Sequence, residues 1–147
     1  MCTHPNATVQ VIQRFTAAPE RVYAAWLDPT LIGRWMFGPQ LVEQEVVRIS
    51  VDPRVGGAFS FVVRRQGQEI DHVGEYLELE PPRRLVFTWG IVGNDSSRVV
   101  VEIVPQDAGC ELTLTHELHP DWADYAGRTE AGWTKMLAAL DEALQSA

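Results

Sequence analysis

Two titratable side chains lie in predicted strands where the residues two positions away, on the same face, are apolar. They are therefore the first candidates for catalytic chemistry. His116 shares its phase with Leu114, and Glu75 shares its phase with Val73 and Leu77. Successive side chains of a strand point to opposite faces, so we expect both groups to face the interior. An imidazole titrates near pH ~6.5, and burial raises the pKa of a carboxylic acid. His116 and Glu75 could therefore transfer protons in a cyclase-, dehydratase- or hydrolase-like enzyme.

Each of these two residues also has a structural interpretation. His116 could be a satisfied core histidine that bonds a backbone carbonyl or a side chain on the last helix, because buried polar groups are usually hydrogen-bonded. Glu75 could turn to solvent if a β-bulge or a slip of one residue reverses the faces of its strand. Tyr76 would then point inward instead. The sequence leaves these alternatives open.

Little else in the sequence indicates catalysis or a metal site. His116 and His119 are three residues apart at the end of a strand, so they point to opposite faces, unlike the paired helical histidines of a zinc protease. Ser60 and Thr88 lie on the faces opposite to their aromatic neighbours. No nucleophile elbow or phosphate-binding glycine loop is present in the sequence. We expect neither a metal nor another cofactor.

Composition restricts the partners of the protein. The chain of 147 residues has 12 Lys and Arg against 20 Asp and Glu, a net charge of −8, which would repel nucleic acid. The basic pairs Arg64-Arg65 and Arg83-Arg84 are therefore expected to be solvated rims, with an anionic partner as the weaker alternative. Two cysteines are too few for a disulfide framework, and no apolar stretch near the N-terminus resembles a signal peptide or a membrane span. We expect a cytoplasmic protein without a membrane span.

Hydrophobic periodicity predicts the elements that position His116 and Glu75. Alternation between turn signals predicts strands over residues 8–15, 41–51, 58–65, 70–79, 84–90, 98–104 and 110–118. The short loops between successive strands indicate an antiparallel sheet. Pro19 opens a first short helix, and Asp28 caps a second over residues 30–35. The chain is thus predicted to have a tail, residues 1–7, and one α+β domain, residues 8–147.

The last predicted element is a long amphipathic helix over residues 121–147. Its apolar residues recur at helical spacing and form one stripe: Trp133, Met136, Leu137, Leu140 and Leu144. If the sheet curves around this stripe, helix and sheet enclose a hollow. In such an architecture the two short helices, with Trp26, Trp35, Met36 and Phe37, would close one end of the hollow. These residues either plug that end as core or form an entrance that opens around Gly33 and Gly38.

The inward-facing residues predict an apolar pocket between the sheet and the last helix. The residues expected to contact a ligand are Trp35, Phe59, Phe61, Phe87, Trp89, Val101, His116, Trp133, Met136, Leu137 and Leu140. An aromatic stripe of this kind is more often plain core. However, the polar groups within it require water, a partner or a ligand. We therefore predict that the pocket binds a small hydrophobic or aromatic molecule.

Several stretches occur in the order seen in one protein family. They are PERVYAAW at residues 19–26, Arg34-Trp35, Gly56-Gly57-Ala58-Phe59, GEYLE at residues 74–78, PRRLVFTW at residues 82–89, LTLTH at residues 112–116 and Gly132-Trp133. Over roughly residues 9–145 the chain resembles the family called activator of heat shock protein 90 ATPase homologue-like. That family belongs to the START-like superfamily, also called SRPBCC, with the birch-pollen allergen and aromatic polyketide cyclases.

The resemblance implies a helix-grip fold. In that fold a seven-stranded antiparallel sheet curves around a long C-terminal helix, two short helices follow the first strand, and a pocket lies between sheet and helix. Members of the superfamily bind lipids, sterols, hormones or polyketides and some are enzymes, so the fold does not select an activity. The namesake co-chaperones carry an additional N-terminal domain for which this chain has no room, which argues against a chaperone partner. A co-chaperone-like interaction module nevertheless stays an alternative function. A homodimer is also possible, because related folds pair through sheet edges or small helices.

Overall fold

The computed structural model describes residues 8–36, 45–91, 97–117 and 126–145. The strands are β1 (Thr8–Phe15), β2 (Glu45–Val51), β3 (Ala58–Arg65), β4 (Gln68–Glu80), β5 (Arg84–Ile91), β6 (Ser97–Gln106) and β7 (Gly109–Glu117). The helices are α1 (Pro19–Ala25), α2 (Pro29–Trp35) and α3 (Ala126–Gln145). The predicted tail, residues 1–7, and residues 41–44, 118, 121–125 and 146–147 of the predicted elements lie outside the described residues, as do Phe37, Gly38 and His119.

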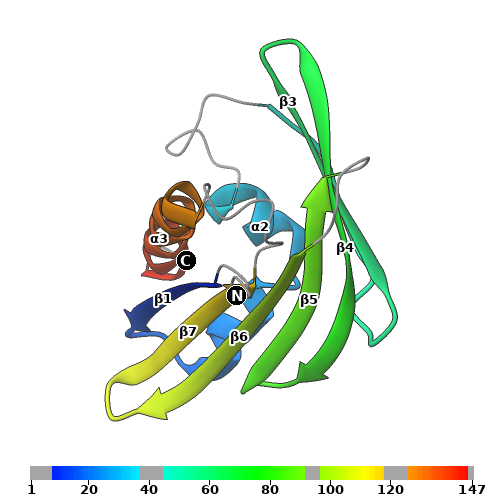
Figure 1. Cartoon of the computed structure of the whole chain (residues 1–147). Helices are drawn as coiled ribbons and strands as arrows, with labels where there is room; N and C mark the ends of the chain where they lie inside the picture. Colours follow the sequence, from blue (N-terminus) through cyan, green and yellow to red (C-terminus); the bar gives the residue numbers. More distant parts are fainter. Residues whose placement is uncertain (1–7, 37–44, 92–96, 118–125, 146–147) are drawn as a thin grey trace, which may run out of the picture.

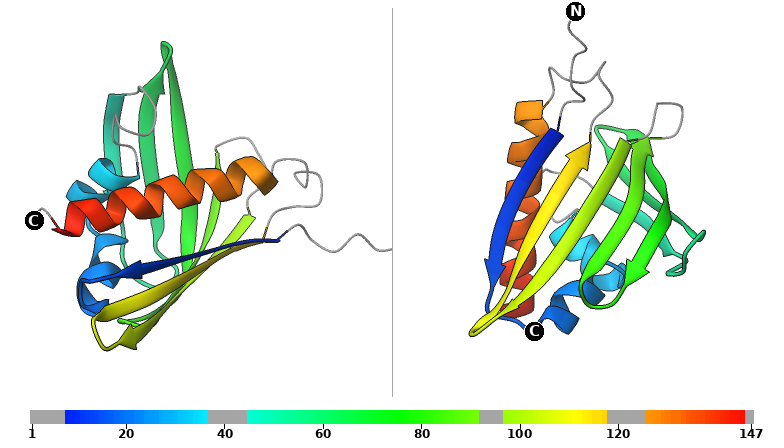
Figure 2. Two further views of the ribbon diagram at one scale, coloured as in Figure 1. Left: turned by 90° about the vertical axis from the view of Figure 1, so that its left-hand side faces the viewer. Right: turned by 60° about the horizontal axis from the view of Figure 1, so that its bottom comes forward.

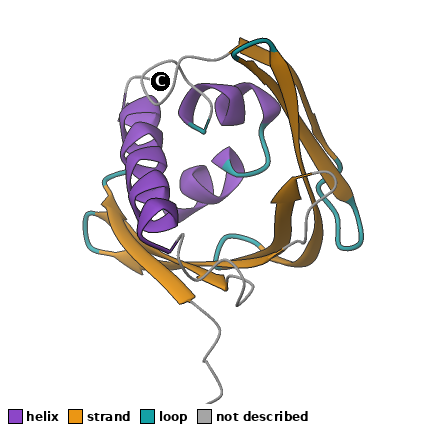
Figure 3. Ribbon diagram, turned by 45° about the horizontal axis from the view of Figure 1, so that its top comes forward, coloured by secondary structure: helices purple, strands orange, loops and turns teal. Residues whose placement is uncertain are grey.

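The strands form one seven-stranded antiparallel sheet with the order β1-β7-β6-β5-β4-β3-β2 (Figure 1). From β2 to β7 each strand pairs with the next one in the chain. The last strand, β7, also pairs with the first strand, β1. The sheet curves, and all three helices lie on its inner side (Figure 3). The expected helix-grip arrangement is therefore confirmed.

Helix α1 begins at Pro19, as the sequence predicts, and α2 begins at Pro29, one residue before the predicted start. Pro19 occupies the first turn of α1, where its missing N–H removes no helical hydrogen bond. At α2, the Asp28 carboxylate accepts hydrogen bonds from the backbone N–H groups of Thr30 and Leu31, at 2.9 and 3.4 Å. These bonds satisfy two of the donors that the start of a helix leaves free.

Helix α3 lies across the inner side of the sheet (Figure 2) and contacts β1, α1 and α2. The predicted apolar stripe is the face that it buries, with Trp133, Leu137 and Leu140 at most 2% exposed. At its C-terminal end, Nη2 of Arg21 donates to the carbonyl oxygen of Leu144 at 2.9 Å. This bond satisfies one of the free carbonyls at the helix end and ties α1 to α3.

Strand β4 presents the opposite faces to those that the alternation predicts. Directly opposite residues of an antiparallel pair share a face, and Gly74 lies opposite the inward-facing Phe59. His72 and Tyr76 are accordingly buried, whereas Glu75 is exposed. The prediction that Glu75 faces the interior is therefore wrong, and the alternative that Tyr76 replaces it is confirmed.

A β-bulge at Leu77 explains this error. Tyr76 pairs with Phe87 and Glu78 pairs with Val86, so Leu77 is an extra residue on β4 and is 39% exposed. Leu79, beyond the bulge, packs against the core. Counting back from Leu79 in steps of two crosses the bulge and assigns the wrong face to every residue before it.

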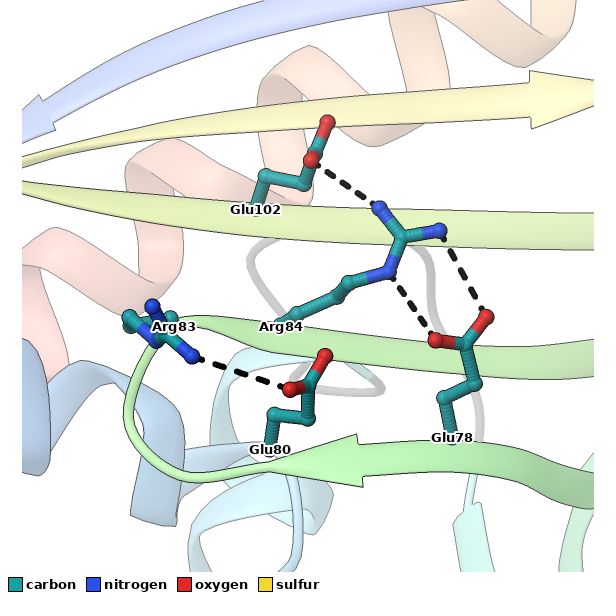
Figure 4. Close-up of polar contacts among 5 residues, drawn as sticks. All are labelled: Glu78, Glu80, Arg83, Arg84 and Glu102. Atoms are coloured by element: carbon teal, nitrogen blue, oxygen red, sulfur yellow. Dashed lines mark hydrogen bonds and ion pairs between the residues drawn. The ribbon is translucent and has the colours of Figure 1, made fainter.

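Ion pairs brace the outer face of the sheet (Figure 4). Arg84 on β5 contacts Glu78 on β4 at 3.2 Å and Glu102 on β6 at 2.9 Å, and Arg83 contacts Glu80 at 3.6 Å. Hydrogen bonds to Glu78, followed by its negative charge, raise the pKa of the Arg84 guanidinium. Arg64 is paired in the same way with two carboxylates, Glu45 and Glu69. Both basic runs are thus partly neutralised by their own sheet.

A side chain at position 74 would collide with its neighbours. A Cβ atom on Gly74 would lie 1.9 Å from the carbonyl oxygen of Thr88 and 2.4 Å from the ring of Phe59. We expect Gly74→Ala to lower the free energy of unfolding by about 1–3 kcal/mol, the usual cost of overpacking. Urea denaturation followed by circular dichroism measures the change.

Gly132→Ala on α3 is the matched control. The nearest atom to its added Cβ would be Cε of Met136 at 3.8 Å, an ordinary contact. We expect this variant to be as stable as the wild type or more stable by up to about 1 kcal/mol, because alanine favours a helix interior. Equal stability of Gly74→Ala and the wild type would contradict the packing around Phe59.

Candidate functional site

Aromatic rings on the inner faces of β3, β4 and β5 form one continuous cluster with Phe59 at its centre. The ring centroid of Phe59 lies 4.7 Å from that of Phe61, 5.5 Å from Tyr76, 5.7 Å from Phe87 and 5.9 Å from Trp89. These separations are typical of favourable aromatic contacts. Gly74 allows the cluster, because the ring of Phe59 occupies the space where a side chain at that position would lie.

Indole rings from the helices extend this cluster across the interior. Trp26, which follows α1, lies 4.8 Å from Trp35 of α2, 6.0 Å from Trp133 of α3 and 6.1 Å from Phe87. Trp133 also lies 5.7 Å from Trp89. We call these rings the aromatic cluster: Trp26, Trp35, Phe59, Phe61, Tyr76, Phe87, Trp89 and Trp133. It connects all three helices to the middle of the sheet.

A small void lies among the rings of the cluster. Its lining among the described residues consists of Trp26, Met36, Phe59, Phe61, Tyr76, Leu85, Phe87 and Trp89. The void measures about 10 Å³, which is close to the minimum for one water molecule. Sites for small molecules commonly measure on the order of 300–1,000 Å³. In this conformation the aromatic side chains therefore fill the hollow that the sequence predicts.

The predicted ligand-binding residues divide into two groups. Phe59, Phe61, Phe87 and Trp89 line the void. The others lie elsewhere in the hydrophobic core, where all are buried except the partly buried Met136: Trp35, Val101, His116, Trp133, Met136, Leu137 and Leu140. The predicted pocket list did not contain Trp26, Met36, Tyr76 and Leu85, which also line the void. Leu85 is two residues from Phe87 on the same strand, so its inward orientation follows from the alternation. The inward orientation of Tyr76 follows only once the bulge at Leu77 is known.

His116 is held in a chain of hydrogen bonds between α3 and β6. Nε1–H of Trp133 donates to Nδ1 of His116 at 3.0 Å, and Nε2 of His116 contacts Oγ of Ser97. The Ser97 hydroxyl donates to the carbonyl oxygen of Trp89 at 3.0 Å. Because an indole can only donate, Nδ1 must be unprotonated and Nε2 must carry the proton. The geometry thus fixes one neutral tautomer of the imidazole.

This arrangement assigns a structural role to His116. Burial lowers its pKa from 6.5 to about 4, so the ring stays neutral at pH 7, and both ring nitrogens already have partners. The proposed partner Glu75 is exposed on β4, separated from β7 by β5 and β6. The predicted acid–base pair of His116 and Glu75 therefore does not form.

Ser97 was missed in the sequence, although a signal was present. It precedes Val99, Val101 and Ile103 by steps of two, and these three residues are buried on the inner face of β6. The predicted strand began one residue later, at position 98. Extending the alternation by one residue would have placed a hydroxyl on the same inner face as His116, which is the cross-strand partner of Val99.

A second buried histidine borders the aromatic cluster. The ring of His72 lies 5.4 Å from that of Trp89, and Nδ1 of His72 lies 3.1 Å from the carbonyl oxygen of Phe61. Because a carbonyl only accepts, Nδ1 carries a proton. Burial, more than any other cause, lowers the pKa of His72. Its side chain therefore adds no positive charge to the cluster at neutral pH.

Two polar atoms in this region are buried without a hydrogen-bond partner among the described residues: Oη of Tyr23 and Nε1 of Trp26. The contrast with the neighbouring indoles is clear. Trp35 donates to the carbonyl oxygen of Ala25 at 3.1 Å, and Trp133 donates to His116. Burial raises the pKa of Tyr23, so its hydroxyl stays protonated. An unpaired buried donor is costly, so each group calls for water or a bound molecule.

Within the described ranges, no group of three or more His, Cys, Asp or Glu residues is placed to hold a metal ion. None of the described helices is long and apolar enough to cross a membrane.

Comparison with known proteins identifies relatives of this arrangement. The sequence model of the family described as Activator of Hsp90 ATPase homolog 1-like protein matches residues 16–145. No curated protein sequence shows significant similarity to the chain.

Solved structures share the fold over nearly the whole chain. A protein from Chromobacterium violaceum is 28% identical, with a TM-score of 0.79 and coverage of 92% of this chain and 95% of the other. A protein from Rhodobacter sphaeroides is 21% identical, with a TM-score of 0.85 and coverage of 99% and 96%. The AHSA1-like protein from Aeromonas hydrophila is 23% identical, with a TM-score of 0.79 and coverage of 95% and 92%. The last two likenesses establish the fold alone.

The burial of His116 predicts that stability depends on pH. Its pKa of about 4 in the folded protein lies below the value of 6.5 expected after unfolding, so the unfolded chain takes up the proton first as the pH falls. The contribution of the neutral His116 to the free energy of unfolding is complete above pH ~6.5 and is lost as the pH falls towards ~4. We expect His116 alone to lower the free energy of unfolding by about 2 kcal/mol between pH 7.5 and pH 5.

Urea denaturation of the wild type and of His116→Gln at both pH values measures this contribution. Glutamine can hydrogen-bond but does not titrate, so the variant should lose less stability than the wild type over the same interval. An equal loss in both proteins would show that His116 is not the titrating group.

Proposed function

The chain belongs to the family of Activator of Hsp90 ATPase homolog 1-like proteins, and from this premise we propose that it binds a small, largely apolar molecule within the aromatic cluster. The observation that carries the proposal is the void between β3–β5 and the short helices, where every lining residue in the described ranges is apolar or aromatic. A guest placed there would contact ring faces and edges on several sides. Such walls favour a flat apolar molecule.

Binding requires side chains to move, because the void is about 10 Å³. Trp89 is the natural boundary of the site, since it is only partly buried while Phe59, Phe61 and Phe87 are each 3% exposed. A ligand would take the place of one or two rings and restore the contacts that those rings lose. The packing is dense, so a guest that replaced no ring would be excluded.

A catalytic function has less support. The two groups that could have exchanged protons do not meet, since Glu75 is exposed and His116 is neutral and bonded at both nitrogens. Among the described residues, the void is lined by no side chain that is charged at neutral pH. Binding without turnover is therefore the better account of this interior.

Ligand binding can be tested by thermal unfolding in the presence of a library of small aromatic and aliphatic compounds. A compound that binds only the folded state at a concentration of 100 Kd adds about 2.7 kcal/mol to the free energy of unfolding. For a domain of this size we expect Tm to rise by about 5–10 °C. Absence of any stabilisation by apolar compounds would contradict the proposal.

Two variants with the same substitution locate the site. Leu85→Phe adds ring atoms at the wall of the void and should abolish the rise in Tm. Leu112→Phe crowds a buried position that does not line the void and should leave the rise unchanged. Near-ultraviolet circular dichroism checks that both variants keep their tertiary packing. Equal ligand responses of the two variants would place the binding site outside the aromatic cluster.

The small volume of the void favours a second candidate function, that of a co-chaperone-like protein-interaction module. Edge strand β2 exposes Val46 and Val47, which are 39% and 42% accessible, beside a register shift before Arg48. Exposed apolar side chains on an edge strand can pair with another chain. We expect an Hsp90 middle domain to bind the wild type more strongly than Val46→Ser/Val47→Ser, as measured by isothermal titration calorimetry. No binding at micromolar concentration would exclude this function.

A further inference from the structure

We propose that the bound molecule is an uncharged planar aromatic compound with a hydrogen-bond acceptor, and that this acceptor bonds to Nε1–H of Trp26. The inference rests on the proposed function, because it assigns the ligand class of the same void. It follows from the position of Trp26, from the chemistry of its unpaired donor and from the charges around the cluster.

Trp26 combines two properties that no other described residue of the cluster shares. It lines the void, and its side chain holds a buried N–H group without an acceptor among the described residues. The residue is 3% exposed, so bulk water does not satisfy the group. An indole N–H can only donate, and therefore the missing partner must be an acceptor.

The void itself offers space for such a partner. Its volume is about 10 Å³, and Trp26 is one of the residues that border it. A ligand whose acceptor reaches the N–H of Trp26 supplies the hydrogen bond that this group lacks, whereas a ligand without an acceptor leaves the N–H buried and unpaired. A hydrocarbon of the same shape lacks the acceptor and should bind more weakly.

The surroundings favour an uncharged ligand. The lining residues that the structure describes include no charged side chain, and burial lowers the pKa of both nearby histidines, His72 and His116. An anion would lose its hydration without gaining a cation from these walls. The rings of Phe59, Phe61, Phe87 and Trp89 supply flat apolar contacts in its place.

The test compares naphthalene, quinoline and 2-naphthoate, which share a fused two-ring core but differ in acceptor and charge. We expect quinoline to bind the wild type about tenfold more tightly than naphthalene, the effect of one buried hydrogen bond. Binding of 2-naphthoate should be at least about tenfold weaker than that of naphthalene. Dissociation constants come from titrations followed by tryptophan fluorescence at pH 7.5.

Two variants separate the donor of Trp26 from other polar groups. Trp26→Phe keeps an aromatic ring without the N–H, so quinoline and naphthalene should bind it with equal affinity. Tyr23→Phe removes the other unpaired buried group, which does not line the void, and should preserve the tenfold preference. Loss of the preference in Tyr23→Phe and its retention in Trp26→Phe would overturn the assignment.

A measurement on the wild type does not depend on the folding of any variant. The chain has five Trp residues, so the indole N–H groups give few signals in a ¹⁵N-correlated NMR spectrum. Quinoline should move the Trp26 N–H signal downfield, whereas naphthalene should not. If naphthalene binds and quinoline neither binds more tightly nor moves this signal, the inference fails while the proposed function stands. If none of the probes binds, the proposed function fails as well.

Discussion

Trp133 joins α3 to the middle of the sheet in two ways, as an apolar side chain packed against Trp89 and as a hydrogen-bond donor to His116. Its ring packs 6.0 Å from Trp26 and 5.7 Å from Trp89, and its N–H bonds to His116 at 3.0 Å. The helix is therefore held by apolar packing and by a polar bond in the same place. Burial keeps His116 neutral, the bond from Trp133 uses its unprotonated Nδ1, and a neutral imidazole can be buried without a counter-ion.

Period-two alternation predicted most of the fold because most strands have one buried face. It correctly assigned the inner faces of β3, β6 and β7 and the buried stripe of α3. It failed on β4, where the bulge at Leu77 changes the phase within one strand. A bulge depends on how two strands pair, so a strand examined by itself does not reveal it. The same failure placed Glu75 inside and created an acid–base pair that the fold does not contain.

The candidate site was predicted in outline but not in volume. Alternation showed that the rings of Phe59, Phe61 and Phe87 face inward, and all of them do. It could not show that these rings close upon each other, because contact distances such as 4.7 Å between Phe59 and Phe61 depend on side-chain rotamers and on the curvature of the sheet. It also could not distinguish the three indoles on or beside the helices. Trp35 and Trp133 have acceptors, whereas no residue of the described part of the chain accepts from the N–H of Trp26, and this difference appears only in the packed structure.

The small volume of the void and a ligand-binding function are compatible if a ring of the ligand takes the place of a ring of the protein. Each aromatic contact contributes about 0.5–1.5 kcal/mol beyond the burial of its area, so opening the cluster costs several such contacts. An aliphatic guest restores the burial but not the ring contacts, whereas a planar aromatic guest restores both. The unpaired N–H of Trp26 adds a further difference, since it stabilises only a guest that carries an acceptor. The ring contacts and the hydrogen bond that a ligand must make therefore determine its affinity more than the volume of the void does.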